Sequence, residues 1–382
     1  MIDKIHYITF KIRIKLLEFY IEVLIIFSAL IRKKRKKQQL HLYPFAQKGS
    51  DGYTRRFEEF IAFLERDGIN FKLHDICTDE EYQIAFSDKK SNYYNFLLRV
   101  LRIRIKQTLD IRNAQKAFVH RNLFPFYYDQ KKPRLEKLAS KLCDEVVYDY
   151  WDSVWVYNEV LNNRTIKFAN TISVANKYLF DHYSRSHSNV KYFNIGVNLD
   201  KYIPKNDYSL TDKSLRIFYT GRPSNVSHML NEIGPFLLNS LNSIRLKLVI
   251  VSAEKPNYPG LEIIHFKFNE ETFFELLNSC DAGIYALKDS VATRGKMAMK
   301  VLDYAATGLP IIATRYGVSP HLNHGENVFF CDDENDWKTY LKLLFDNKNE
   351  REKIGKNARL MAEKFHTLEK TYQQFKDLFK SI

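Results

Sequence analysis

Short apolar runs alternate with amphipathic segments along most of the chain, in the repeated order strand, helix, strand. The first such unit combines a strand at 38–45, a helix at 57–66 and a strand at 69–75. Later apolar runs predict strands at 117–120, 145–148, 168–174, 190–198, 215–219, 246–252, 262–266, 282–285 and 309–314. Strands that alternate with helices form parallel sheets covered on both faces. Because both halves of the chain show this order, we predict an α/β protein with two Rossmann-like domains.

The most informative stretch is 289–317, DSVATRGKMAMKVLDYAATGLPIIATRYG. It predicts a loop and then a helix from 297 to 306, which Gly308 and Pro310 would end before a buried strand. Polar side chains fall on one stripe of this helix and apolar side chains fall roughly opposite. The polar stripe holds Lys296, Lys300, Asp303 and Thr307, and the apolar stripe holds Ala298, Val301, Leu302 and Ala305.

Cations near the start of this helix predict an anion site. Arg294, Lys296 and Lys300 would add their charges to the unpaired N–H groups and the dipole of the helix N-terminus. A diphosphate suits such a place, and Asp303, one turn deeper, could accept hydrogen bonds from sugar hydroxyls. An ordinary solvated polar face explains the helix taken alone equally well.

The same stretch resembles the donor-nucleotide segment of GT-B glycosyltransferases, closest to family-four-like members. The matching residues are Arg294, Gly295, Lys296, Lys300, Tyr304, Ala306, Gly308, Pro310 and Gly317. The resemblance implies two Rossmann-like domains facing across a cleft and transfer of a sugar from a nucleotide-diphospho-sugar, most often UDP-linked. Many retaining members carry Glu at both positions that here hold Gly295 and Asp303. The resemblance therefore implies a ribose contact for Asp303 and leaves retention or inversion open.

A second match to the family follows the strand predicted at 215–219. Residues 220–225, TGRPSN, stand where related enzymes contact the donor phosphates. The resemblance thus implies a donor site that includes Gly221, Arg222, Ser224, Gly317 and Val318. Arginine suits this place because its guanidinium is always charged and offers a fork of donors.

Two strand ends in the first half, AFVHRNLFPF and VVYDYWDSVW, resemble the family segments that reach the cleft. The resemblance implies catalytic positions for Arg121, Asp149 and Asp152. An inverting transfer needs a carboxylate that takes the proton of the acceptor hydroxyl. Asp152 or Asp149 could serve, and we favour Asp152. The competing interpretation is that Asp152 caps the helix that follows it.

The loop predicted at 48–56, KGSDGYTRR, follows the first strand. In an open α/β sheet, ligands bind beyond the carboxyl ends of the strands, where this loop must lie. Gly52 would let the backbone approach a substrate closely. Tyr53, Arg55 and Arg56 could then contact an acceptor. A plain turn that requires glycine explains the segment nearly as well.

Residues 1–37 differ from the rest of the chain. They combine apolar and charged positions and end in a basic run at 32–37. The stretch 19–31 is interrupted by Glu22 and is shorter than the ~20 apolar residues of a spanning helix. We predict an amphipathic helix on an anionic membrane surface. A helix docked on the protein itself and a short true span are the alternatives. Residues 92–113 predict a half-buried helix with a basic face, either solvated or turned to the same membrane.

Composition narrows the class of partner. The chain has 382 residues, 45% of them hydrophobic and 14% aromatic, which argues against disorder. A net charge of +14 points to nucleic acid, an anionic membrane or diphosphate substrates. The basic run beside an apolar helix favours a membrane, and no nucleic-acid reader motif is present. The four cysteines and eleven histidines show no metal-ligand spacing, so we expect neither a metal site nor a cofactor.

These observations predict four parts: a membrane-surface extension at 1–37, an acceptor domain at 38–205, a donor domain at 206–364, and a helix at 365–382 that returns toward the first domain. We expect a peripheral protein on the cytoplasmic face of the inner membrane. It would transfer a sugar to a lipid-linked or glycolipid acceptor in bacterial polysaccharide assembly. A sugar-nucleotide epimerase or a non-catalytic sugar-nucleotide-binding module of the same fold is the alternative.

Overall fold

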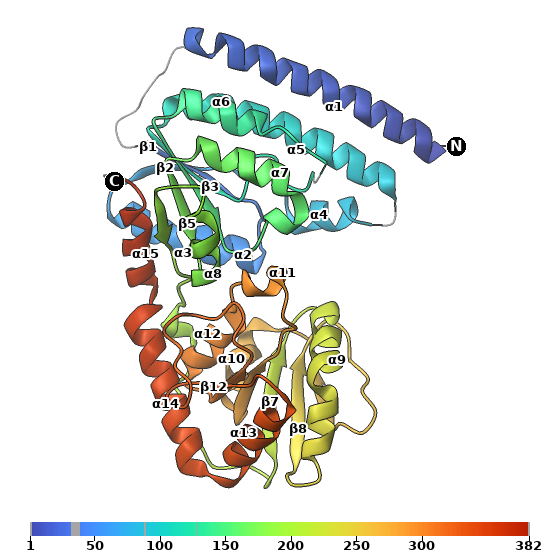
Figure 1. Ribbon diagram of the computed structural model, residues 1–382, viewed down its shortest axis with the longest axis vertical. Coiled ribbons are helices and arrows are strands. Elements are labelled where there is room, and N and C mark those ends of the chain that lie inside the picture. The colour runs from blue at the N-terminus through green and yellow to red at the C-terminus, as the bar shows by residue number, and fades with distance from the viewer. Residues whose placement is uncertain (1, 32–38, 88, 128, 381–382) are drawn as a thin grey trace. The chain divides into compact units, whose positions relative to one another are not determined.

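The computed structural model describes residues 2–31, 39–87, 89–127 and 129–380, which form two α/β units (Figure 1). One unit comprises Met1–Asn194 with Tyr372–Ile382, and the other comprises Ile195–Thr371. Each contains a six-stranded sheet in which every described pairing is parallel. The prediction of two Rossmann-like α/β domains is therefore confirmed.

The sheet of the first unit has the order β2-β1-β3-β4-β5-β6. Its strands are β1 (Gln39–Tyr43), β2 (Asn70–Leu73), β3 (Lys116–His120), β4 (Glu145–Tyr150), β5 (Thr171–Val174) and β6 (Val190–Tyr192). Its helices are α1 (Ile2–Ile26), α2 (Asp51–Tyr53), α3 (Glu59–Arg66), α4 (Asp79–Ala85), α5 (Lys90–Asp110), α6 (Arg134–Leu142), α7 (Trp155–Thr165) and α8 (Lys177–Tyr183). Every residue of β4 is buried, as expected for a central parallel strand covered on both faces.

The sheet of the second unit has the order β12-β11-β10-β7-β8-β9. Its strands are β7 (Leu215–Thr220), β8 (Leu246–Val251), β9 (Ile263–Phe266), β10 (Ala282–Tyr285), β11 (Ile311–Ala313) and β12 (Phe329–Phe330). The helices are α9 (Pro223–Ser240), α10 (Glu270–Asn278), α11 (Val291–Arg294), α12 (Met299–Thr307), α13 (Glu334–Asp346) and α14 (Lys348–Phe365). The two-residue strand β12 was not predicted, because two apolar residues carry no measurable period.

The units begin and end at other residues than the predicted domains. The segment 195–205 clusters with the second unit, where Lys205 N donates to Thr307 O at 2.8 Å and Lys205 Nζ donates to Asn278 O at 2.8 Å. The last helix, α15 (Leu368–Asp377), crosses the other division at 371/372. Phe375 of this helix packs against Phe60 and Phe193 in the core of the first unit.

The loop predicted at 48–56 is helical from Asp51 onward, so that prediction was wrong for most of its length. Ser50 caps this helix by accepting a hydrogen bond from Tyr53 N, and Thr54–Glu58 form a π-helical turn before α3. Gly52 sits inside the helix, where a Cβ would lie 3.0 Å from the ring of Trp151. The glycine therefore serves close packing of helix against ring, and not a turn.

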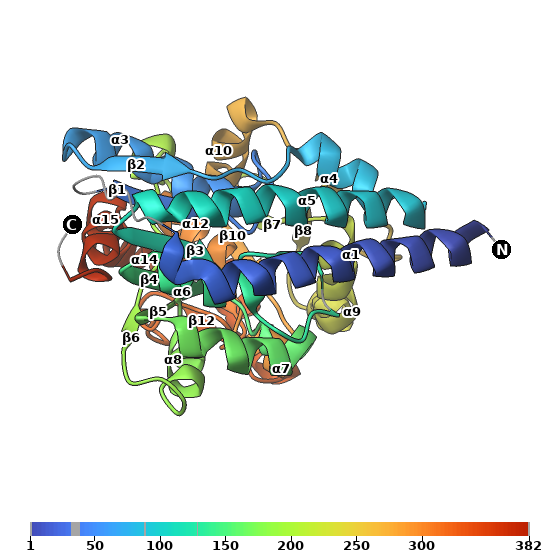
Figure 2. The same ribbon diagram turned by 90° about the horizontal axis from the view of Figure 1, so that it is seen from above.

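Helix α1 lies along α5 and α6, as Figures 1 and 2 both show. Phe10, Ile14, Ile21 and Ile25 are buried in the core that these helices share. Arg134 of α6 forms ion pairs with Glu18 at 3.2 Å and with Glu22 at 2.8 Å. The alternative of a helix docked on the protein thus holds for one face of α1.

The opposite face of α1 and of the short turn that follows it carries large exposed apolar side chains. These are Ile5, Ile8, Ile12, Leu16, Phe19, Ile26, Phe27 and Leu30, which we call the apolar stripe. None of the helices described in the structure has the length and apolar character needed to cross a membrane. The basic run predicted at 32–37 lies outside the described residues. Helix α5 is half-buried, with Arg102 and Lys106 exposed.

Substitutions on the buried and the exposed face of α1 should differ in their effect on the free energy of unfolding. Ile14 is 1% exposed and Ile12 is 58% exposed. We expect Ile14→Ala to lower the free energy of unfolding by about 2–5 kcal/mol, because it leaves a cavity under α5 and α6. Ile12→Ala, the matched control, should change it by less than about 0.5 kcal/mol. Chemical denaturation measures both, and equal effects would contradict the docked position.

Candidate functional site

In the second unit, the turn after β7 begins the candidate donor site. Gly221 N donates to Val251 O at 3.0 Å, Arg222 is the N-cap residue of α9, and Pro223 opens the helix. Proline suits this position because it lacks only an N–H that would be unpaired anyway. Arg222 and Ser224 are exposed. The first-turn N–H groups of α9 therefore face an accessible edge at the carboxyl end of the sheet.

Lys300 reaches this turn from α12. A Cβ placed on Gly221 would lie 3.6 Å from Lys300 Cε, and Lys300 Nζ lies 5.4 Å from the ring centroid of Tyr219. Lys300 is half-buried, and its side chain lies next to the end of β7 and the turn before α9. The structure thus brings together Gly221 and Lys300, two donor-site residues that the sequence predicts from separate motifs.

Gly317 holds the segment before α12 in place. Its φ is +68°, and a Cβ there would lie 2.3 Å from Lys296 O. Ala298 N donates to Gly317 O at 2.8 Å. Any side chain at this glycine would therefore separate the two backbone segments that position Lys296. Val318, next in the chain, is half-buried.

Helix α12 begins two residues later than predicted and ends at Thr307. Gly308 follows it at φ +80°, which confirms the predicted glycine stop. The four residues of the predicted apolar stripe are all buried. The polar stripe is buried in its second half as well, since Asp303 is 6% and Thr307 is 1% exposed. A fully solvated polar face on this helix is therefore excluded.

Two of the predicted donor residues are held by other side chains. Asp303 accepts a hydrogen bond from Tyr202 Oη at 2.6 Å. Arg294 forms a two-pronged ion pair with Asp289, with both distances 2.6 Å. The hydrogen bond from Arg294 holds the pKa of the Asp289 carboxyl below its usual range. A ligand that needs Arg294 must compete with Asp289 for it.

In the first unit, Asp149 at the end of β4 is sealed inside the protein. Its carboxylate accepts hydrogen bonds from Arg56 Nε and Nη2, both at 2.8 Å, and from Ser173 Oγ at 2.7 Å. Arg56 also donates to Asn194 O at 2.7 Å and Phe193 O at 3.0 Å. Both charged side chains are 0% exposed. In this structure Asp149 is a structural ion-pair partner that a hydroxyl group cannot reach.

Asp152 is in a different environment. Its carboxylate forms an ion pair with Arg121 Nη2, and its side chain is 26% exposed. Arg121 has φ +64° and its guanidinium lies 4.2 Å from the ring centroid of Phe45. Val154, and not Asp152, occupies the N-cap position of α7, and the structure shows no side-chain cap there. The capping interpretation of Asp152 was therefore wrong.

The predicted acceptor residues lie on the helical segment after β1. Gly52 packs against Trp151, the neighbour of Asp152 in the chain. Tyr53 is buried and its hydroxyl donates to Asp75. Arg55 is half-buried. The structure brings Gly52 to the strand end that carries Asp152, whereas Tyr53 has a packing role.

Two residues around these strand ends were missed as parts of the site. Arg56 was assigned only a possible acceptor contact, although it neutralises Asp149. His120 is fully buried against Trp151, with ring centroids 4.6 Å apart, and burial lowers the pKa of its imidazole far below the usual range. Neither ring nitrogen of His120 has a partner within the described part of the chain. The sequence feature that could have identified His120 is its position at the end of a predicted strand, next to Arg121.

The contrast between the two aspartates can be measured. Asp149→Asn leaves the Arg56 charge buried without a counter-charge, so we expect the free energy of unfolding to fall by about 3–5 kcal/mol. Asp152→Asn, the matched control, breaks a partly solvated pair and should cost about 1 kcal/mol or less. Urea denaturation followed by circular dichroism tests this. A small loss for Asp149→Asn would show that its pair with Arg56 is not needed for folding.

Part of the chain matches a known family in sequence, and most of the chain matches solved structures in fold. Residues 235–377 match the family described as glycosyl transferase-like. No curated protein matches the chain in sequence. Sucrose-phosphate synthase from Thermosynechococcus elongatus has a similar structure, with a TM-score of 0.65 and 12% identity over 90% of this chain and 98% of that one.

Two further solved structures resemble the chain. HepE from Anabaena, in complex with UDP and glucose, has a TM-score of 0.58 and 12% identity over 90% of this chain and 100% of that one. A glycosyltransferase from Rickettsia africae has a TM-score of 0.61 and 13% identity over 91% of this chain and 100% of that one. The chain therefore has the GT-B fold that these solved structures share, and its residues 235–377 are similar in sequence to the glycosyl transferase-like family.

Proposed function

We propose that this protein is a glycosyltransferase that moves a hexosyl group from a nucleotide-diphospho-sugar to a membrane-associated, lipid-linked saccharide or glycolipid. The observation that carries the proposal is the meeting of Lys300 with Gly221 at the start of α9. A flexible cation, an accessible arginine and the N–H groups of a helix N-terminus converge there. This combination suits the diphosphate of a nucleotide-sugar.

The chemistry of this place is electrostatic. When the glycosidic bond to the donor breaks, negative charge develops on the departing nucleoside diphosphate. Lys300, Arg222 and the first-turn N–H groups of α9 would stabilise that charge as it forms. We propose that these protein cations do this without a divalent metal ion at the phosphates. UDP is the expected nucleotide, and HepE, a structural neighbour, binds UDP and glucose.

Asp152 is the proposed base if the transfer inverts the anomeric centre. Its carboxylate is partly exposed, whereas that of Asp149 is fully buried in its pair with Arg56. Arg121 forms an ion pair with this carboxylate and would have to release it to an acceptor hydroxyl.

The apolar stripe of α1 supports a membrane-associated acceptor. Soluble monomeric proteins seldom expose contiguous apolar patches of this kind unless they bind a partner or a membrane. Lys15 is mostly exposed and Arg13 is exposed on the same helix, which favours an anionic bilayer surface. We propose that the protein binds the cytoplasmic face of the inner membrane through this stripe, in bacterial polysaccharide or glycolipid assembly.

Lys300→Ala should abolish nucleotide binding and leave the fold intact, because the side chain is half-buried at the edge of the site. Thermal-shift titrations of the wild type and of Lys300→Ala with UDP, GDP and CMP measure the loss of binding. A ligand at a hundredfold excess over its Kd stabilises the folded state by about 2.7 kcal/mol. Lys255→Ala, an exposed lysine in the turn after β8, is the control and should bind like the wild type.

A shift with one nucleotide that only Lys300→Ala removes would support the site and identify the donor. The absence of a shift with all three nucleotides would contradict the donor site. Binding of a nucleotide-sugar without transfer to any saccharide acceptor would favour the epimerase or the non-catalytic module.

Leu16→Ser should weaken membrane binding. Leu16 is 64% exposed within the apolar stripe, and Leu360, on α14 of the other unit, is 60% exposed. In flotation with vesicles containing anionic phospholipid, we expect Leu16→Ser to reduce the bound fraction and Leu360→Ser to leave it unchanged. Equal flotation of all three proteins would show that the stripe does not face lipid.

A further inference from the structure

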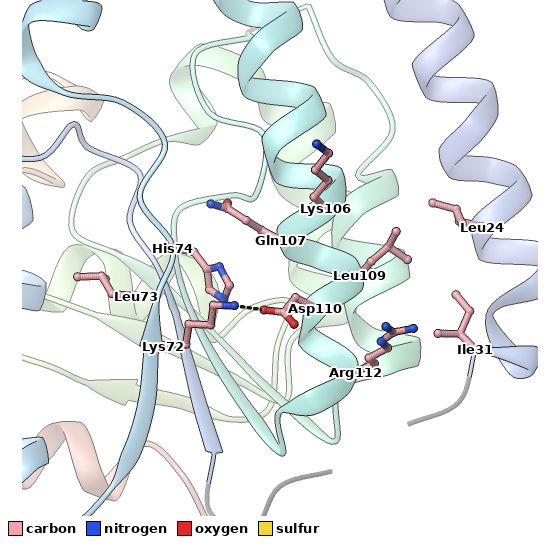
Figure 3. A pocket seen from close by; sticks show the side chains of 10 residues that line it. All are labelled: Leu24, Ile31, Lys72, Leu73, His74, Lys106, Gln107, Leu109, Asp110 and Arg112. Atoms are coloured by element: carbon pink, nitrogen blue, oxygen red, sulfur yellow. Dashed lines mark hydrogen bonds and ion pairs between the residues drawn. The ribbon is translucent and has the colours of Figure 1, made fainter. Parts of the chain in front are cut away.

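A pocket of about 750 Å³ lies in the first unit, beside the ends of α1, β2 and α5 (Figure 3). Leu24 and Ile31 line one side of it. Figure 3 shows Lys72, His74 and Asp110 grouped on the other side, with Asp110 projecting from α5 toward the residues of β2. None of these residues belongs to the candidate donor or acceptor site.

Two histidines meet at this polar side. His41 of β1 and His74, directly after β2, are both buried. His74 Nε2 lies 3.0 Å from His41 Nδ1, and the ring centroids are 4.7 Å apart at an interplanar angle of 52°. Two nitrogens that bind one ion at about 2.1 Å stand roughly 3.0–3.4 Å apart, since the angle at the ion is about 90–110°. This contact is an imidazole–imidazole hydrogen bond, which an ion bound between the two nitrogens would replace at nearly the same separation.

Asp110 brings a carboxylate to the same place. The ligand atoms of His41, His74 and Asp110 all lie within 4.8 Å of one another. Asp110 accepts hydrogen bonds from Lys72 Nζ at 2.5 Å and from Asn113 Nδ2 at 2.6 Å. A small rotation away from Lys72 would bring the carboxylate to coordination distance, with Asn113 orienting its second oxygen.

The ligand types and the orientation of the rings also fit a bound ion. Neutral imidazole and carboxylate oxygen together suit borderline divalent ions. Tyr43 stacks on His74, with ring centroids 4.5 Å apart and an interplanar angle of 10°, which restrains the ring.

We propose that His41, His74 and Asp110 bind one divalent transition-metal ion of the Zn²⁺ or Co²⁺ class, with water from the pocket completing its coordination. The ion would join β1, β2 and α5, and it would displace Lys72 from Asp110 because both cations need the same carboxylate. The proposal rests on these contacts and is independent of the proposed sugar transfer and of its phosphate site.

Metal titration of the full-length protein, without an affinity tag and after treatment with a chelator, tests the proposal. We expect calorimetry with Zn²⁺ to show one ion per chain, and Co²⁺ to give visible d–d absorption. His74→Gln and Asp110→Asn should each weaken binding by about tenfold or more, because each removes a ligand. Lys72→Met should strengthen binding, because it removes the competing charge.

His228→Gln changes an exposed histidine on α9 and is the matched control, which should bind like the wild type. Failure of the folded wild type to bind either ion stoichiometrically would overturn the proposal. Binding that survives in both His74→Gln and Asp110→Asn would also overturn it, since the ion would then lie elsewhere. Asp110 is half-buried, so Asp110→Asn keeps the test valid if the histidine variant does not fold.

Discussion

The ion pair between Arg56 and Asp149 is the constraint on which the first unit depends. It joins the π-helical turn after β1, the end of β4 and the backbone that follows β6. A charge buried without a partner is strongly destabilising, so the guanidinium must stay where all of its partners can meet it. Trp151 lies over the same guanidinium at 5.5 Å, and Gly52 packs against that ring. The pair thereby also decides that Asp152 is the carboxylate left partly exposed.

The second unit depends in a comparable way on close backbone approach. Gly317 lies against the carbonyl oxygen of Lys296, and Gly283 of β10 lies against the ring of Tyr304. The second contact holds α12 close to the sheet, which brings Lys300 to Gly221 and the start of α9. Positions that look like simple turns or small core residues therefore determine where the proposed phosphate-binding cation lies.

Helix α1 shows how one amphipathic pattern can serve two surfaces. Its buried face packs against α5 and α6. Glu18 and Glu22, the acidic residues that interrupt its apolar sequence, form ion pairs with Arg134. The apolar stripe remains outside this packing. A docked helix with an exposed apolar face can bind a bilayer without leaving the protein, so docking and membrane binding, which compete as interpretations of the sequence, are compatible in the structure.

The sequence by itself determined the α/β class, most of the strands and the glycine that ends α12, because these depend on local periodicity and on backbone conformations that few residues adopt. It also indicated Gly221 and Lys300 as members of one site, through their resemblance to a family. It did not show that the helix after β1 starts at Asp51, because tertiary packing of Gly52 on Trp151 overrides the local preference of glycine for turns.

Only the tertiary structure decided which charged residues are partners. Asp149 and Asp152 are three positions apart at one strand end, yet burial makes one a structural ion and leaves the other near solvent. His41, His74 and Asp110 have no ligand spacing in the chain, because two neighbouring strands and a helix bring them together. Burial and long-range contacts determine which charged groups pair. Neither burial nor long-range contacts can be inferred from the residues that are adjacent in the sequence.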